Sequence, residues 1–272
     1  MNRDVLYPLQ EAVLSKLQAM EDPQFNQAKL CGGTALSRCW LEHRLSYDLD
    51  FFLPEGFNAA DIAIALKKAG IVYETKDIVD DPRKANQLHG YIIHNGQRLK
   101  VSFVEDAYFK TFPAVEKAFG ALTVRTEEIA GLYHRKLRTV CGHGEGEKED
   151  SFEGGRQKAR DLFDLHVLST EFMPIRQFMD KLPYSFPSGA FDNGLASMPW
   201  FDLMDELEEI VCAPEWNQAK NVEFLQNALY TQIGAAVLDD MTEGDAQEEE
   251  PIPPTTQNGG RRRETGQGGP SR

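Results

Sequence analysis

The chain has 272 residues, of which 41% are hydrophobic and 26% are charged, and its formal net charge is −14 at pH 7. This composition predicts a soluble protein with enough apolar residues for one large domain or two small ones. The negative charge excludes a general nucleic-acid coat, because phosphate contacts require clustered Lys and Arg. An RNA substrate would have to bind a local basic patch against an unfavourable overall field.

Cysteines and apolar runs indicate the cellular compartment. The four cysteines are scattered without Cys-x-x-Cys spacing, which is typical of reduced thiols and not of a disulfide framework or a zinc site. No apolar run follows Met1, and no stretch approaches the ~18 apolar residues of a membrane span. We therefore expect a cytoplasmic protein with no membrane partner.

The first predicted element is an amphipathic helix over Asp4–Met20, in which leucines and valines recur at helical spacing. We expect this helix to pack on the core and to carry no chemistry.

The stretch Leu30–Pro54 follows and is the most informative part of the chain. Its Gly32-Gly33-Thr34 segment indicates a tight turn between a strand and a helix. The later segment Asp48–Phe52 predicts a short strand, whose period of two places both carboxylates on one face and Leu49 and Phe51 on the other.

This arrangement suits a nucleoside triphosphate. Asp48 and Asp50 form an all-oxygen pair of the kind that binds Mg²⁺. The glycine pair allows close backbone approach, and the start of the following helix offers unpaired N–H groups to phosphate. The predicted nucleotide-binding residues of this stretch are Gly32, Gly33, Thr34, Arg44 and Ser46.

The rest of the first half alternates between helix and strand. A helix over Ala59–Ala69 is capped by Asn58, a strand begins at Ile71, and Asp77–Asn86 is polar enough to be a loop. The Asn95-Gly96 pair then predicts the turn of a hairpin. Its two strands are Leu88–His94 and Arg98–Val104.

From Thr126 onward the pattern becomes helical. The predicted helices are Glu127–Cys141, Gln157–Thr170, Ile175–Leu182, Ser197–Ile210 and Asn221–Leu238. The glycine-rich acidic segment Gly142–Gly155 between the first two predicts a loop. The residues after about Thr242 predict a disordered tail. For the triple arginine at 261–263 in this tail, a solvated segment is the favoured interpretation over an RNA contact.

Three segments together resemble a known family. The run GGTAL followed by HRLSYDLDFF, then Lys136, and then Arg160-Asp161-Leu162-Phe163-Asp164-Leu165, are similar to the motifs of the AbiEii/AbiGii toxins. These are nucleotidyltransferases of the DNA polymerase β superfamily. The resemblance spans roughly the first two thirds of the chain, and its first motif is the specific one.

The resemblance implies roles for further residues. It places Lys136 against the nucleotide phosphates, Asp161 beside the acceptor hydroxyl, and Arg160 and Asp164 in the nucleotide site. It also places a third carboxylate on the strand beside Asp48–Phe52, but the matching residue here is Ser102. Glu105 lies nearby and would need a bulge or the end of the strand to turn it toward the pair.

Structural alternatives accompany two of these assignments. Lys136 would be equally explained by a solvated helix face, and the segment from Arg160 to Asp164 by an exposed helix with internal ion pairs. For the second segment the functional interpretation is favoured, because two separate motifs agree.

The resulting prediction is an α/β nucleotidyltransferase core followed by a helical domain. The predicted divisions are an N-terminal helix (1–24), the core (25–122), the helical domain (123–240) and the tail (241–272). The predicted reaction is Mg²⁺-dependent transfer of an NMP from an NTP to an acceptor, either RNA such as the tRNA 3′ end or protein. Family resemblance also implies a cognate antitoxin. The alternatives are a non-catalytic nucleotide- or partner-binding module, which Ser102 favours, and a metal-dependent phosphohydrolase.

Overall fold

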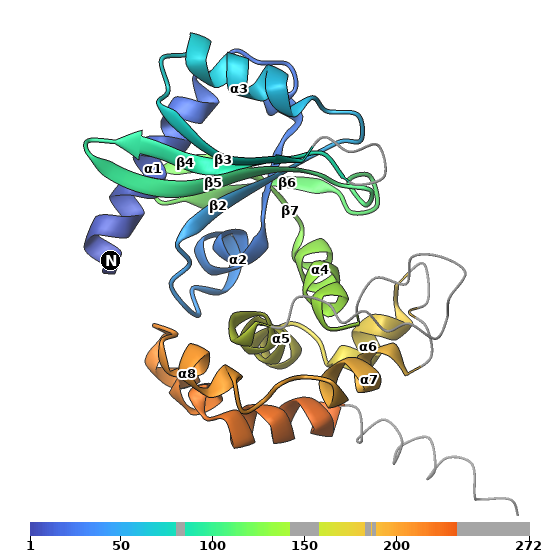
Figure 1. The fold of residues 1–272 in the computed structure, drawn as a ribbon. Helices are drawn as coiled ribbons and strands as arrows, with labels where there is room; N and C mark the ends of the chain where they lie inside the picture. The colour runs from blue at the N-terminus through green and yellow to red at the C-terminus, as the bar shows by residue number, and fades with distance from the viewer. Residues whose placement is uncertain (80–84, 142–157, 183–185, 187–188, 233–272) are drawn as a thin grey trace, which may run out of the picture.

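The computed structural model describes residues 1–79, 85–141, 158–182, 186 and 189–232. Its N-terminal half contains a seven-stranded mixed sheet, and its C-terminal half consists of short helices (Figure 1). The strands lie in the order β3-β4-β5-β2-β1-β7-β6. They are β1 (Lys29–Cys31), β2 (Asp48–Leu53), β3 (Tyr73–Val79), β4 (Gln87–His94), β5 (Gln97–Glu105), β6 (Ala114–Phe119) and β7 (Leu122–Glu127).

The centre of the sheet is the β1–β2 unit, which forms as predicted. Strand β1 ends at Gly32, whose φ of 72° lies in the left-handed region that glycine adopts without strain. The chain then forms helix α2 (Gly32–Ala35) and a π-helical turn, η2 (Leu36–Leu41). It returns as β2, antiparallel to β1 and parallel to β5.

Apolar side chains and helices cover the sheet. Leu49 and Phe51 of β2 are buried on one face, where Phe51 packs between Phe25 and Phe103 with ring centroids 5.1 and 5.8 Å apart. Helices α1 (Arg3–Gln18) and α3 (Ala59–Lys68) pack on strands β3–β5. Helix α2 lies on the opposite side of the sheet from α3 (Figure 1).

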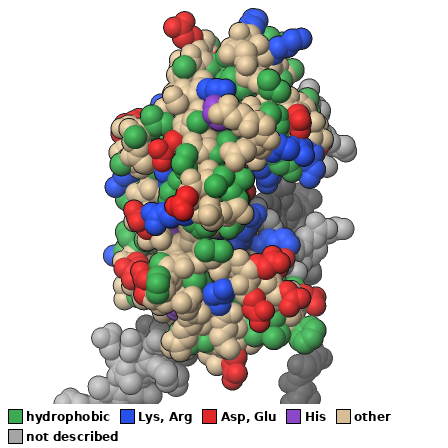
Figure 2. Space-filling model, turned by 90° about the vertical axis from the view of Figure 1, so that its left-hand side faces the viewer, with side chains coloured by type: hydrophobic (Ala, Val, Ile, Leu, Met, Phe, Trp, Pro, Cys, Tyr) green, Lys and Arg blue, Asp and Glu red, His purple; other side chains and the backbone are tan. Residues whose placement is uncertain are grey.

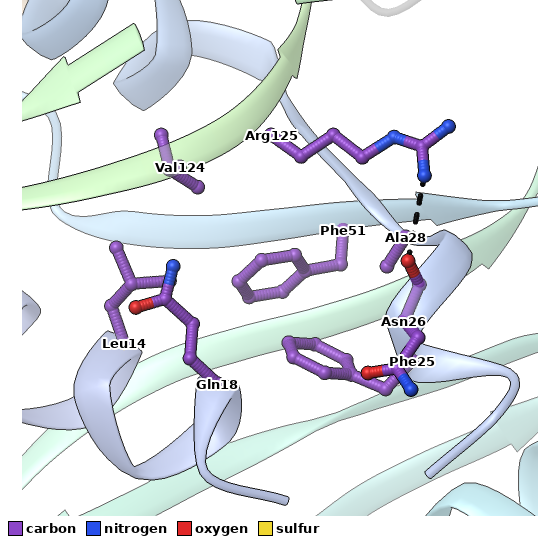
Figure 3. Close-up of a pocket in the computed structure, with 8 residues that line it drawn as sticks. All are labelled: Leu14, Gln18, Phe25, Asn26, Ala28, Phe51, Val124 and Arg125. Carbon is purple, nitrogen blue, oxygen red and sulfur yellow. Dashed lines mark hydrogen bonds between the residues drawn. The ribbon is translucent and has the colours of Figure 1, made fainter. Parts of the chain in front are cut away.

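A small cavity of about 200 Å³ lies on the Phe51 face, between α1 and the turn that precedes β1. Figure 3 shows Phe25, Phe51, Leu14 and Val124 around it, with Arg125 at one side. The Arg125 guanidinium donates a 3.5 Å hydrogen bond to the Asn26 carbonyl. Phe51 and the two aspartates alternate along β2, so the sheet separates this cavity from the face that carries Asp48 and Asp50.

The C-terminal half begins with α4 (Ile129–Cys141), which packs against α2 and η2. A buried ion network holds its first turns against the sheet: Arg135 lies 2.6 Å from Asp106 and 2.7 Å from Glu127, and Lys29 lies 3.6 Å from Glu127. The other elements are α5 (Ala159–Glu171), α6 (Ile175–Asp180), α7 (Ala190–Ala196), α8 (Leu203–Glu208), the 3₁₀ helix η3 (Pro214–Lys220) and a helix over 222–232.

Several predicted elements are confirmed. The N-terminal helix, the Asp48 strand, the helix capped by Asn58 and the hairpin all form. In the hairpin turn, Asn95 and Gly96 both have positive φ (49° and 76°), as a type I′ turn requires.

Other predictions were wrong. β3 runs on through Val79, into the predicted loop, and the predicted helix Ser197–Ile210 is reduced to α8 with α7 before it. The hairpin β6–β7 was not predicted, although Gly120 (φ 62°) marks its turn. The predicted boundary at 122 falls on the first residue of β7, which belongs to the sheet. The predicted loop (142–155) and tail (241–272) lie outside the described residues.

Candidate active site

The two carboxylates of β2 lie on one face of the sheet and have different neighbours. Asp48 is 7% exposed; its Oδ1 accepts a 3.4 Å hydrogen bond from Ser46, and its Oδ2 lies 3.8 Å from the Lys100 ammonium. Asp50 is half-buried and points toward the glycine turn, because a Cβ at Gly32 would lie 3.0 Å from its Oδ2. Asp50 therefore faces the glycine turn, and Asp48 faces Lys100.

The glycine turn is shaped by close contacts. A Cβ at Gly33 would lie 2.4 Å from the Arg44 guanidinium and 3.0 Å from the Ser46 hydroxyl. The Thr34 hydroxyl donates a 2.5 Å hydrogen bond to the Asp48 carbonyl. The Thr34 hydroxyl is thus used to hold β2 in place. The hydrogen-bond donors that this turn can offer to a phosphate are therefore its backbone N–H groups.

The expected third carboxylate position is occupied by serine. Ser102 of β5 pairs in register with Asp50, so both side chains point to the same face. Its hydroxyl is buried and has no hydrogen-bond partner among the described residues. Glu105 is not turned toward the pair; its carboxylate accepts hydrogen bonds from the backbone of Gly56 and Asn86 at the far end of β5.

A buried charge network joins the two halves of the chain. Asp164 of α5 is fully buried and accepts two hydrogen bonds from Arg44, of 2.6 and 2.7 Å, and one of 2.7 Å from His43. Lys136 of α4 lies 2.5 Å from Asp161 and 2.7 Å from Asp164. Neither residue lies on a solvated helix face as the alternatives required, because Lys136 is 5% exposed and Asp161 is 1% exposed.

This network determines the protonation states of Asp164 and His43. Burial alone would raise the pKa of Asp164, but the charges of Arg44 and Lys136 and the hydrogen bonds hold that pKa well below its usual value. Burial lowers the pKa of His43 despite its contact with Asp164. At neutral pH the pair therefore consists of an ionised Asp164 and a neutral His43 that donates its Nε2 proton.

Arg160 lies apart from this network. It lines an open pocket of about 320 Å³ together with Tyr47, Asp48, Tyr91 and Lys100. Asp161 and Asp164, from the same helix, instead point inward to Lys136. The predicted set from α5 thus divides into one outward-facing cation and two inward-facing carboxylates.

Sequence reasoning did not select His43, Tyr91, Arg98 or Lys100. The hairpin alternation contained a usable signal for the last two, because positions 98, 100 and 102 share a face of β5. Nothing local marks His43, whose partner Asp164 is 121 residues away.

The donor set fits one hard cation. Asp48 and Asp50 supply oxygen ligands, and Mg²⁺ commonly takes one or two carboxylates and completes its shell with substrate phosphates and water. Among the described residues, no group of three or more His, Cys, Asp or Glu side chains is placed to hold a metal. The site therefore fits a metal ion that binds together with a nucleotide better than a metal ion held by protein ligands alone.

Comparisons with solved structures concern the fold. A protein from H. pylori described as a candidate nucleotidyltransferase has a similar structure, with a TM-score of 0.52, 18% identity, and coverage of 89% of this chain and 99% of that chain. JHP933 from Helicobacter pylori has a TM-score of 0.46 and 18% identity, covering 88% of this chain and 96% of that chain. The likeness to the first of these structures shows a shared fold, which is the mixed α/β sheet with a helical C-terminal part that the sequence predicted.

The family is shown by a second comparison. Residues 15–230 match the nucleotidyl transferase AbiEii toxin family of type IV toxin–antitoxin systems. The chain belongs to this family, which confirms the predicted resemblance. A search of curated proteins gave no match. None of the described helices has the length and apolar character that a membrane crossing requires.

Proposed function

We propose that this protein transfers an NMP from an NTP to an acceptor hydroxyl and acts as the toxin of a toxin–antitoxin pair. Family membership supports nucleotidyl transfer by a toxin with a cognate antitoxin. The observation that carries the proposal is the carboxylate pair of β2, which faces the glycine turn on one side and an open pocket on the other.

In the proposed complex, backbone N–H groups of Gly32, Gly33 and Thr34 bind the triphosphate. Asp48 and Asp50 are the residues that would hold Mg²⁺. When bound, this ion supplies positive charge that offsets the phosphate charge in the transition state. Ser46 keeps Asp48 oriented through its hydroxyl.

Lys136 and Asp161 form the second wall of the proposed site. The Lys136 ammonium is held between two carboxylates and offsets negative charge on the nucleotide. Asp161 takes the proton of the acceptor hydroxyl. The acceptor oxygen forms a bond to the α-phosphorus as the bond to the β-phosphate bridging oxygen breaks, and pyrophosphate leaves. Arg44 and Asp164 act as positioning residues, because their bidentate pair joins the segment before β2 to α5.

The test is label transfer to cell extract or total tRNA with each NTP in turn, labelled at either the α- or the γ-phosphate. We expect incorporation from the α-label alone, and none by Asp48→Asn/Asp50→Asn. A matched control, Glu208→Gln/Glu209→Gln, removes two exposed carboxylates from α8 and its C-terminal end and should retain full transfer. Incorporation from the γ-label would refute NMP transfer, and γ-phosphate release without incorporation would indicate a phosphohydrolase.

A binding module without turnover is the second candidate, favoured by Ser102 at the position opposite Asp50. It predicts that NTP binds, measured by calorimetry, while no label is incorporated with any acceptor. Binding without incorporation in parent and control alike would establish this alternative.

A further inference from the structure

Two cross-strand pairs surround the carboxylates of β2. Strands β2 and β5 are parallel, and their register pairs Asp48 with Lys100 and Asp50 with Ser102. Residues that pair in register point to the same face of a sheet, and so do residues two apart on one strand. The four side chains therefore form one block, in which each aspartate of β2 has one neighbour on β5.

The neighbour of Asp50 supplies no charge. Ser102 is 1% exposed, and its hydroxyl has no hydrogen-bond partner in the described part of the chain. The next residue in this row is His89 of β4, whose Nε2 atom lies 2.7 Å from the side-chain oxygen of Gln87. Two divalent cations about 3.5–4 Å apart repel each other, so a site for two needs more carboxylate charge than a site for one. The row through Asp50 offers a single carboxylate.

The neighbour of Asp48 is a cation. The Lys100 ammonium lies 3.8 Å from the Asp48 Oδ2 atom. This distance is too long for a hydrogen bond, so the ammonium offsets the charge of Asp48 without using this oxygen as an acceptor. Asp48 can therefore bind a metal ion through Oδ2 while part of its charge is already neutralised.

Further cations near Lys100 disfavour a second metal ion on this side. The open pocket next to Asp48 is lined by Arg98, Lys100 and Arg160, although the formal net charge of the whole chain is −14. Figure 2 views the side of the molecule where the N-terminus lies and shows Lys and Arg side chains beside a hollow between the upper and lower halves. A divalent cation that entered here would be repelled by these side chains.

The charges of the block suit a single divalent cation. The two aspartates, Lys100 and one divalent cation together carry one positive charge. Three carboxylates with two divalent cations also carry one positive charge. Positive charge around the phosphates is what stabilises the transition state of this class of reaction. The serine at position 102 therefore leaves the site with the same net charge as a two-metal site.

We infer that the Asp48–Asp50 site binds one divalent cation, and that Lys100 supplies the positive charge that a second cation supplies in a two-metal site. Ser102 belongs to this arrangement, because a carboxylate beside Asp50 would attract a second cation. The inference rests on the proposed function for the identity of the reaction. The number of bound cations, however, is measured without turnover.

The first measurement is a titration with Mn²⁺ alone, in which electron paramagnetic resonance reports the unbound ion. The variant Asp48→Asn/Asp50→Asn corrects for Mn²⁺ bound elsewhere on this acidic chain. Lys100→Met should bind Mn²⁺ roughly ten-fold more tightly than the parent, because one like charge is removed next to the bound ion. Lys100→Met/Ser102→Asp should bind it more tightly again, because it adds a third carboxylate.

The second measurement counts the bound ions in the presence of α,β-methylene analogues of the four NTPs, which cannot be cleaved at the α-phosphate. The parent should bind one Mn²⁺ per chain above the corrected background, and Lys100→Met/Ser102→Asp should bind two. Two ions bound to the parent would overturn the inference. So would a Lys100→Met/Ser102→Asp variant that gains neither affinity nor a second ion while its circular dichroism matches that of the parent.

The matched control is Arg98→Met, which removes the other cation on this face of β5. Arg98 pairs with Ile93 of β4 and has no aspartate of β2 in register with it. Its effect on Mn²⁺ affinity should stay below about three-fold, because the charge lies farther from Asp48. An effect as large as that of Lys100→Met would overturn the specific role of Lys100. Ser102→Asp alone retains Lys100 and should gain less affinity than the double variant.

Label transfer separates this inference from the proposed function. If no NTP gives transfer but the Mn²⁺ results are as expected, the proposed function fails and the single-cation site stands. If the parent transfers label and binds two ions, the function stands and the inference fails. Lys100→Met should lower transfer roughly ten-fold at unchanged affinity for the analogue, and adding Ser102→Asp should restore part of it. A merely structural role of Lys100 gives no such rescue, so its absence in a folded double variant would overturn the role of Lys100.

Discussion

Arg44→Met tests whether the buried charge network holds the two halves of the molecule together. Arg44 precedes β2 and is 5% exposed, and its guanidinium makes two hydrogen bonds to Asp164 and one of 2.9 Å to the Leu45 carbonyl. Methionine keeps much of the side-chain volume but removes the charge. Asp164 then remains fully buried, and among the described residues its partners are His43 and Lys136.

The expected loss is large for a single residue. Removing one partner of a buried ion pair typically costs about 3–5 kcal/mol, because the remaining charge keeps its desolvation penalty. Since Lys136 still neutralises part of the Asp164 charge, we expect the lower end, about 3 kcal/mol. For a domain with about 5–15 kcal/mol of stability, this loss is a substantial fraction.

Urea unfolding followed by circular dichroism measures the effect. The midpoint should fall by about 1 M with little change in slope. The matched control is Arg176→Met, which breaks the exposed ion pair between Arg176 and Asp180, 3.5 Å apart. It should cost less than about 0.5 kcal/mol of stability. The double variant Arg44→Met/Asp164→Leu should lose less than the sum of its single variants, because the unpaired charge is gone. A loss at Arg44 no greater than at Arg176 would refute the reasoning.

Three further predictions follow from local geometry. Burial beside Arg138 and Arg135 lowers the pKa of His134 to about 3, whereas the unfolded chain binds this proton near pH 6.5. Unfolding therefore takes up a proton below pH 6.5. Between pH 6.5 and about pH 5, the free energy of unfolding of the parent should fall by about 2 kcal/mol more than that of His134→Phe. Urea unfolding at both pH values measures this difference. Gly33→Ala places a methyl group 2.4 Å from the Arg44 guanidinium and should destabilise by about 1–3 kcal/mol, with a parallel loss of NTP affinity in calorimetry; unchanged affinity would remove the glycine turn from the nucleotide site. Ser102→Ala should change stability by less than about 1 kcal/mol, since the hydroxyl has no partner among the described residues, and should leave label transfer intact; a ten-fold loss of transfer would give Ser102 a direct role.

The sequence predicted those features of the site that depend on neighbours along the chain. The period of two in Asp48–Phe52 placed both carboxylates on one face, because strand geometry alone fixes that alternation. The left-handed turn at Gly32 and the cap at Asn58 were predictable for the same reason, since each depends on one residue type with a specific local conformation.

Contacts between distant segments could not be predicted in this way. The Arg44–Asp164 pair joins residues 120 positions apart, and neither residue carries a local mark of burial. In the sequence, Lys136 had the pattern of a solvated helix residue, because a buried lysine is recognisable only once its carboxylate partners are placed. The pairing of Ser102 with Asp50 came from the family resemblance and not from periodicity, which leaves strand order open.

The buried network is better explained by positioning than by stability. Replacing a buried ion pair with well-packed apolar side chains is often neutral or stabilising, so stability alone gives no reason to keep four charges and a histidine in the interior. These charges do, however, fix geometry: Arg44 lies two residues before Ser46, which contacts Asp48, and its partner Asp164 also binds Lys136. One bidentate pair thus sets the distance between the carboxylate strand and the lysine of α4. Arg44→Lys, which keeps the charge but loses the fork, should therefore reduce transfer more than it reduces stability.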